Sequence, residues 1–254
     1  MAITSRLPVR AAFVASLLLS SLALARAEAP CPAEPPPPAL HLHNLRAALE
    51  RGKEGVVVAL GSSSTKGTMA SDPAHSYPAE LQVDLEHALP RMHIAVLNRG
   101  IGGQDAPEEL ARLQADAIAV RPQLVVWQVG ANGALRGADP AVFRRMVTEG
   151  VERLKAAGID VILMDNQHSP RVDAAPEDAE LDAILAQVAQ ATGTGLFSRA
   201  ALMTAWDKEG APEIAFIAAD RLHENDRGYV CTAKALADAI LDGLRETRTL
   251  SARR

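Results

Sequence analysis

Residues 55–68 read GVVVALGSSSTKGT, an apolar run that ends at a glycine and continues into three serines, a threonine and a lysine. The apolar residues are consecutive rather than alternating, which is typical of a parallel strand covered on both faces. The polar residues begin where such a strand would end. The stretch therefore predicts a strand followed by a polar turn. By itself it leaves open whether the turn binds phosphate, holds a nucleophile or only caps the next helix.

Further apolar runs of strand length follow at regular intervals. They are HIAVLN (93–98), QLVVWQV (123–129), DVILMDN (160–166) and the weaker TGLFSRA (194–200). The segments between them are longer and carry helical spacing, which indicates strands that alternate with helices. This order predicts an α/β fold, a three-layer α/β/α sandwich around a mainly parallel sheet of roughly five strands, flavodoxin-like in type.

The expected helices have recognisable ends and apolar stripes. Residues 78–89 place Leu81, Leu85, Ala88 and Leu89 on one stripe. Residues 107–120 begin with a proline and acids, which favour a helix N-terminus. Residues 139–158 have Asp139 as cap, a proline in the first turn and a terminating glycine. A further helix should follow residue 176, and the last should run from about residue 225 to 245.

The N-terminal residues indicate export. Two arginines precede the apolar stretch 11–25, AAFVASLLLSSLALA, and a small-x-small cleavage signal ends at Ala27. At about 15 residues the stretch is short for a membrane span of roughly 20. We interpret residues 1–27 as a signal peptide of a periplasmic or secreted protein, the alternative being an uncleaved anchor. Residues 28–39 are a proline-rich tail, and the folded domain should occupy residues 40–250.

The charge distribution excludes one class of partner. The chain of 254 residues has a formal net charge of −5, and both signs are spread along it without a basic block. This argues against nucleic-acid binding. No segment after residue 27 is apolar for long enough to span a membrane. The sequence is silent on the oligomeric state.

The cysteines and histidines indicate no metal site and no cofactor. Cys31 and Cys231 are the only cysteines. In an exported protein they can form a disulfide, or Cys231 can be a small buried hydrophobe and Cys31 a free thiol; both alternatives stay open. His41 and His43 lie beside the tail without a third ligand nearby in the sequence.

The serine-rich turn fails the best-known strand-to-turn motifs. A phosphate-binding loop needs lysine after its second glycine, and Lys66 precedes Gly67. The dinucleotide pattern G-x-G-x-x-G is absent after the first strand. A G-x-S-x-G nucleophile turn would need a glycine at position 65, which is Thr65. A turn that only caps the next helix is the remaining simple interpretation.

The other loops that follow strands change this interpretation, because ligands in such sheets bind at the carboxyl ends of the strands. Residues 98–103 contain three glycines in four positions, which permit close approach of backbone N–H groups to an anion. Residues 130–133 offer the side-chain amide of Asn132. Near the C-terminus, Asp220 lies three residues before His223, and Asn225 can cap the last helix.

In this order, the four blocks resemble the SGNH (GDSL-type) hydrolase superfamily. The blocks of that superfamily are G-D-S-x-[ST]-x-G, N-x-x-x-x-G, G-x-N-D and D-x-x-H-P. Here they read as residues 61–67, 98–103, 130–133 and 220–224, so the resemblance covers about residues 55–245. Three positions differ: Ser62 and Gly133 replace aspartates, and Glu224 replaces the proline.

The resemblance implies an SGNH hydrolase fold and assigns roles to particular residues. Ser63 would be the nucleophile, His223 the base and Asp220 the group that orients the imidazole. The backbone N–H groups of Ser63 and Gly103 and the side-chain amide of Asn132 would form the oxyanion hole. His168, just past a strand end, is the alternative base, although no aspartate stands at the same spacing from it.

The resemblance further implies a serine esterase that acts through an acyl-enzyme and needs no metal. We expect a small or single-chain acyl ester as substrate, because the chain lacks an evident lid and its aromatic content of 3% does not favour a long sugar-binding groove. One alternative is an O-acetyl esterase acting on cell-envelope carbohydrate. The other is a non-catalytic binding module on the same scaffold, since the aspartate of G-D-S is missing.

Overall fold

The computed structural model describes residues 30–251, so the expected signal peptide lies outside the described residues. Five strands form one sheet in the order β2-β1-β3-β4-β5, and all neighbouring pairs are parallel. The strands are β1 (Gly55–Gly61), β2 (Ile94–Gly100), β3 (Leu124–Gln128), β4 (Asp160–Met164) and β5 (Gly195–Phe197). The expected parallel sheet is confirmed.

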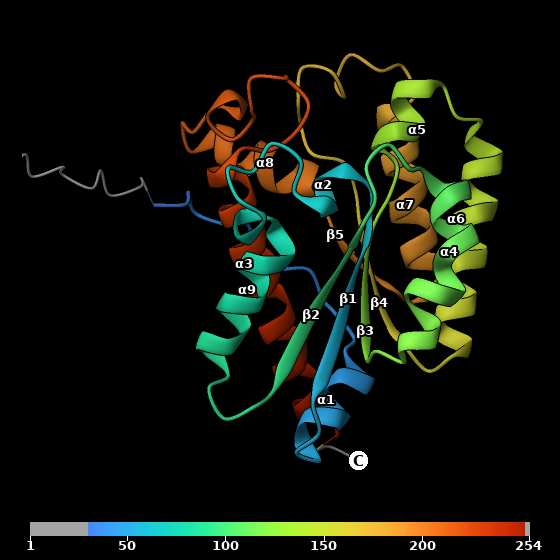
Figure 1. The fold of residues 1–254 in the computed structure, drawn as a ribbon, viewed down its shortest axis with the longest axis vertical. Helices are drawn as coiled ribbons and strands as arrows, with labels where there is room; N and C mark the ends of the chain where they lie inside the picture. Colours follow the sequence, from blue (N-terminus) through green and yellow to red (C-terminus); the bar gives the residue numbers. More distant parts are fainter. Residues whose placement is uncertain (1–29, 252–254) are drawn as a thin grey trace, which may run out of the picture.

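Helices cover both faces of the sheet, which gives the expected three layers (Figure 1). On one face lie α1 (His43–Glu50), α3 (Tyr77–Ala88), α8 (Arg199–Lys208) and α9 (Asp226–Ser251). On the other lie α4 (Ala106–Asp116), α6 (Pro140–Ala156) and α7 (Asp178–Thr192). Two short helices, α2 (Ser63–Lys66) and α5 (Ala131–Arg136), sit at the carboxyl edge of the sheet, which is the upper edge in Figure 1.

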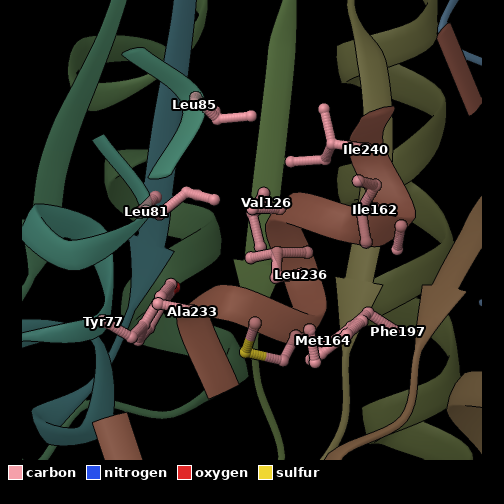
Figure 2. Close-up of a cluster of buried hydrophobic side chains, with 14 of the residues drawn as sticks. Tyr77, Leu81, Leu85, Val126, Ile162, Met164, Phe197, Ala233, Leu236 and Ile240 are labelled. Atoms are coloured by element: carbon pink, nitrogen blue, oxygen red, sulfur yellow. The ribbon is translucent and has the colours of Figure 1, made fainter. Parts of the chain in front are cut away.

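Each face of the sheet has its own buried apolar core. Figure 2 shows the first, where Leu81 and Leu85 of α3 and Leu236 and Ile240 of α9 converge on β3 and β4. The expected stripe of residues 78–89 is therefore largely correct. Ala88 is the exception and is exposed, although the next residue, Leu89, packs partly buried against the core.

Several expected helix ends are confirmed by their hydrogen bonds. The Asp139 side chain accepts from the backbone N–H of Val142 at 2.9 Å, which caps α6. The Asn225 side chain accepts from the N–H of Gly228 at 3.0 Å at the start of α9. Both bonds satisfy backbone donors that a helix N-terminus leaves without partners.

Three expected boundaries are wrong. The last helix, predicted to end near residue 245, continues as α9 to Ser251. The helix predicted over residues 107–120 stops at Asp116 and is followed by a separate 3-10 turn, Ile118–Val120, because the chain must reverse at Arg121 (φ +55°) to enter β3. The strand predicted over residues 194–200 stops at Phe197. Ser198 instead caps α8 by accepting from the N–H of Ala201 at 3.0 Å, so the polar end of that run begins a helix.

The proline-rich segment is tied to the last helix. Cys31 and Cys231 form a disulfide with a Cα–Cα distance of 5.4 Å, which decides between the two alternatives that the sequence left open. Lys234 of α9 lies 3.1 Å from the Glu34 carboxylate. Residues 30–42 have no regular secondary structure, and these two contacts fix them against α9.

Candidate active site

The site lies where the strand order reverses. The first strand in the chain, β1, has β2 on one side and β3 on the other, so the loops after these three strands meet at the carboxyl edge. This edge is the usual ligand position in open parallel sheets. Ser63 follows β1, Gly103 follows β2 and Asn132 follows β3. The sheet topology therefore brings the first three sequence blocks together.

The side-chain amide of Gln128 holds the turn after β1 in place. Gln128, the last residue of β3, is fully buried, and its Oε1 accepts from the backbone N–H of Ser62 at 3.1 Å. The same oxygen accepts from the hydroxyls of Ser62 at 3.0 Å and Thr65 at 3.2 Å. These bonds place Ser63 at the first position of α2, with its side chain half-buried.

Glycines allow the close packing of this turn. A Cβ on Gly100 would lie 2.1 Å from the backbone nitrogen of Lys66, so only glycine lets β2 approach α2. Gly67 ends α2 with φ +88°, a conformation that other residues avoid. The second glycine of the first block is thus a C-cap rather than part of a phosphate loop.

Ser63, His223 and Asp220 form a continuous hydrogen-bonded chain. The Nε2 of His223 lies 2.7 Å from Ser63 Oγ. The Nδ1 of the same ring lies 2.5 Å from Asp220 Oδ2. His223 is 8% exposed, so the ring is largely shielded from water. In this arrangement one ring nitrogen can accept the serine proton while the other donates to the carboxylate.

The turn before His223 orients the Asp220 carboxylate and favours its ionised form. Asp220 Oδ1 accepts from the backbone N–H groups of Leu222 at 3.0 Å and His223 at 3.1 Å. Burial acts to raise the pKa of Asp220, but the hydrogen bonds from the His223 ring and from these N–H groups outweigh it, so the pKa lies below its ordinary value. Arg221, which lies between Asp220 and Leu222, adopts φ +60° and so closes the turn.

The expected oxyanion donors come from the loops beside the serine turn. Within residues 30–251, no backbone carbonyl accepts from the N–H of Ser63 or Gly103. A Cβ on Gly102 would lie 3.9 Å from Ser63 Cβ, so this loop is in contact with the serine. Asn132 donates one amide hydrogen to the Gln104 carbonyl at 2.8 Å, which holds its side chain in place. The arrangement suits a negative oxygen near Ser63.

The three departures from the superfamily blocks have local structural explanations. Ser62 bonds Gln128, as described. A Cβ on Gly133 would lie 2.9 Å from the carboxylate of Asp105, so that carboxylate, from the loop after β2, fills the space of a longer side chain. Glu224 is fully buried and accepts from the Thr232 hydroxyl at 2.7 Å. Its other oxygen lies 3.9 Å from the buried guanidinium of Arg199.

His168, the alternative base, lies elsewhere. Its Nδ1 is 2.9 Å from Asp173 and its Nε2 is 3.0 Å from the Thr204 hydroxyl. The structure thus supplies a partner aspartate that the sequence spacing did not suggest. Both ring nitrogens of His168 are thus engaged by Asp173 and Thr204 rather than by Ser63.

Sequence reasoning missed the supporting residues. Gln128 is a polar residue inside an apolar strand run, which is a signal that could have found it. Gln167, fully buried after β4, donates to the Leu222 carbonyl at 2.7 Å and so holds the turn before His223. No such signal marks Asp105, which fills the space beside Gly133, or Arg112, whose guanidinium donates to the Gly61 carbonyl at 2.9 Å, because charged residues on a surface helix or at its start are common. Among the described residues, no three His, Cys, Asp or Glu side chains gather as a metal site would require.

The profile of the non-GDSL lipase-like family matches residues 28–246. The chain belongs to this family. This family match, with the fold and the sequence blocks, makes it a member of the SGNH hydrolase superfamily.

Curated relatives of this family member match over shorter segments. The uncharacterised lipoprotein YqeF of Bacillus subtilis is 33% identical over 121 residues, 45% of this chain and 49% of that protein. Esterase TesA of Pseudomonas aeruginosa is 35% identical over 75 residues, 30% of this chain and 37% of that protein. An arylesterase of Vibrio mimicus is 31% identical over 86 residues, 34% and 42%. The chain thus spans half or less of the length of these relatives.

Solved structures support the fold of the family member. A two-domain esterase active on acetylated mannans has a TM-score of 0.69 at 20% identity, covering 83% of this chain and 56% of that one. The crystal structure of TesA has a TM-score of 0.61 at 24% identity, covering 73% and 97%. The acetylxylan esterase Axe2 of Geobacillus stearothermophilus has a TM-score of 0.61 at 21% identity, covering 75% and 94%.

Proposed function

We propose that this protein is a serine esterase that hydrolyses carboxylic esters through an acyl-enzyme. The main support is the chain of hydrogen bonds from Ser63 through His223 to Asp220. The family match and the esterases among the relatives support the same reaction class. The backbone N–H groups of Ser63 and Gly103, which no backbone carbonyl of the described residues accepts, support it further.

The proposed reaction has two halves. Ser63 Oγ attacks the ester carbonyl carbon while its proton passes to His223 Nε2, and Asp220 stabilises the imidazolium that forms. The N–H groups of Ser63, Gly103 and Asn132 bind the resulting oxyanion. Collapse of this intermediate breaks the bond to the alcohol, which takes the proton from His223. Water then attacks the acyl-serine by the same route and releases the carboxylic acid.

A small or single-chain acyl ester is the proposed substrate. An acetylated carbohydrate is the second candidate, because two of the similar folds come from esterases of acetylated mannan and acetylxylan. Initial rates on p-nitrophenyl esters of two to twelve acyl carbons, set beside acetylated mannan and xylan oligosaccharides, separate the two. Faster hydrolysis of the acetylated oligosaccharides than of the p-nitrophenyl esters would favour an acetylated carbohydrate as the substrate over a small or single-chain acyl ester.

Export to the periplasm or medium belongs to the same proposal. It is supported by the signal-peptide pattern of residues 1–27 and by the disulfide between Cys31 and Cys231, which forms stably only in an oxidising compartment. Among the described residues, no helix has both the length and the apolar character needed to cross a bilayer.

Covalent labelling tests the enzyme against a binding module. A fluorophosphonate probe should label the wild-type protein, and Ser63→Ala should lose all labelling and ester hydrolysis while keeping its melting temperature. Ser64→Ala is the matched control and should still be labelled, because Ser64 is a buried neighbour in the same turn. A folded wild-type protein that resists labelling would contradict the proposed reaction.

A further inference from the structure

Arg112 of α4 joins the loops that carry the proposed oxyanion hole. Its guanidinium donates through Nη2 to the Gly61 carbonyl at 2.9 Å and through Nη1 to the Arg99 carbonyl at 2.8 Å. Its Nε donates to Gln104 Oε1 at 2.5 Å. A single, largely buried side chain thus bonds the end of β1, the end of β2 and the loop after β2.

These acceptors stand next to the donors of the proposed site. Gly61 lies two residues before Ser63, and its carbonyl also accepts from the N–H of Ile101 at 3.0 Å. Gln104 directly follows Gly103, and its own carbonyl accepts from the Asn132 side chain. Arg112 therefore connects, directly or through Gln104, to the segment of every proposed oxyanion donor.

We propose that Arg112 is a positioning residue that sets the spacing between the Ser63 turn and the donors from Gly103 and Asn132. This inference rests on the proposed function. A planar guanidinium can direct several N–H groups to separate acceptors at once, whereas a lysine ammonium on a flexible stem cannot keep that geometry. A displacement of about 1 Å at a catalytic group can cost about 10²-fold in rate.

A purely structural role makes a different prediction. Arg112 also forms an i,i+4 ion pair with Asp116, 2.9 Å away. If Arg112 served only to stabilise α4, loss of that pair would reproduce the loss of the arginine. Asp116→Asn removes the pair while leaving the three bonds to Gly61, Arg99 and Gln104, so it is the matched control.

Steady-state hydrolysis of p-nitrophenyl butyrate tests the proposal. Arg112→Lys should lower kcat by about 10- to 100-fold and change KM by less than about threefold, because the oxyanion donors act in the transition state. Asp116→Asn should keep kcat within about twofold of wild type. Melting temperatures report folding separately. Wild-type kcat in Arg112→Lys, or an equal loss in Asp116→Asn, overturns the proposal.

A double-mutant cycle on the rate adds a measurement that a change in the stability of α4 would not affect. Because Arg112 acts in part by placing the Asn132 amide, Arg112→Lys should cost less rate in an Asn132→Ala background than in the wild type. Fully multiplicative effects overturn the proposal. If Arg112→Lys does not fold, Gln104→Ala removes one acceptor of the guanidinium and should show a smaller loss of kcat with the same non-additivity. An inactive wild type overturns the proposed function as well, whereas an active wild type with unaffected variants overturns only this inference.

Discussion

The Nε2 atom of His223 lies 2.7 Å from the Oγ atom of Ser63 across 160 positions of sequence. Ser63 follows the first strand and His223 precedes the last helix. The packing of α9 beside α3 and the bond from Gln167 to the Leu222 carbonyl bring them together. The third member, Asp220, reaches the same ring through a local turn.

Asp220→Asn should show whether a carboxylate is required beside the His223 ring or whether any polar side chain suffices. The amide can donate to His223 Nδ1 and so favour the tautomer whose Nε2 carries the proton and cannot accept one from Ser63. We expect kcat to fall by about 10³- to 10⁴-fold. Steady-state kinetics beside thermal melting measure this. More than a tenth of wild-type turnover in the folded variant would contradict the assigned role.

Asn132→Ala should keep the fold and lose about 10²- to 10³-fold in kcat, because one oxyanion donor is removed. The side chain is only half-buried, and its hydrogen bond goes to a loop carbonyl. Circular dichroism and melting temperature establish folding, and single-turnover acylation measures the chemical step. Near-wild-type acylation would remove Asn132 from the site.

Ser62→Asp restores the superfamily residue and should nevertheless destabilise this protein. Gln128 Oε1 already accepts three hydrogen bonds in a buried position, so a carboxylate at residue 62 would place acceptor against acceptor. We expect a loss of about 1–3 kcal/mol in the free energy of unfolding. Ser62→Ala, which removes one bond without adding charge, should lose about 1 kcal/mol. A gain in stability for Ser62→Asp would show that Gln128 rearranges.

Glu109→Gln should flatten the pH dependence of stability. Glu109 is fully buried, which raises its pKa to about 8 despite the 2.8 Å bond from Trp127 Nε1. Because the folded state keeps the proton between about pH 4.5 and 8 while the unfolded state loses it, ionisation of the unfolded chain lowers stability as pH rises through that range.

Urea denaturation at pH 5 and pH 8 measures this effect. The wild type should lose a few kcal/mol relative to Glu109→Gln between the two values. The amide oxygen that this substitution introduces can still accept from Trp127, so the comparison isolates the charge. A constant difference between the two proteins at both pH values would place the pKa of Glu109 near its ordinary range.

Cys31→Ser should destabilise the protein because the disulfide closes a loop with a sequence separation of 200. A chain-entropy argument gives up to about 5 kcal/mol for so long a loop. The same shift in the denaturation midpoint should appear in wild-type protein treated with reductant, and reductant should not affect Cys31→Ser. Equal stability of oxidised and reduced wild type would contradict the prediction.

Each boundary or short helix that the sequence missed depends on a feature that apolar periodicity does not show. Ser198 lies at the end of an apolar run, yet its hydroxyl caps α8, since a cap needs only one polar side chain at the right turn. The 3-10 turn after α4 depends on Arg121 in a left-handed conformation, which composition does not reveal. Short helices such as α2 and α5 have too few residues to show a period.

The sequence by itself determined the order of strands and helices along the chain, the three polar blocks at strand ends and the fourth before the last helix, because apolar periodicity and turn residues are local properties. Tertiary structure alone decided which of the candidate histidines meets Ser63, that Cys31 pairs with Cys231, and that Gln128 and Arg112 support the loops. Those contacts join residues far apart in the chain. They depend on side-chain reach and burial, which no local pattern specifies.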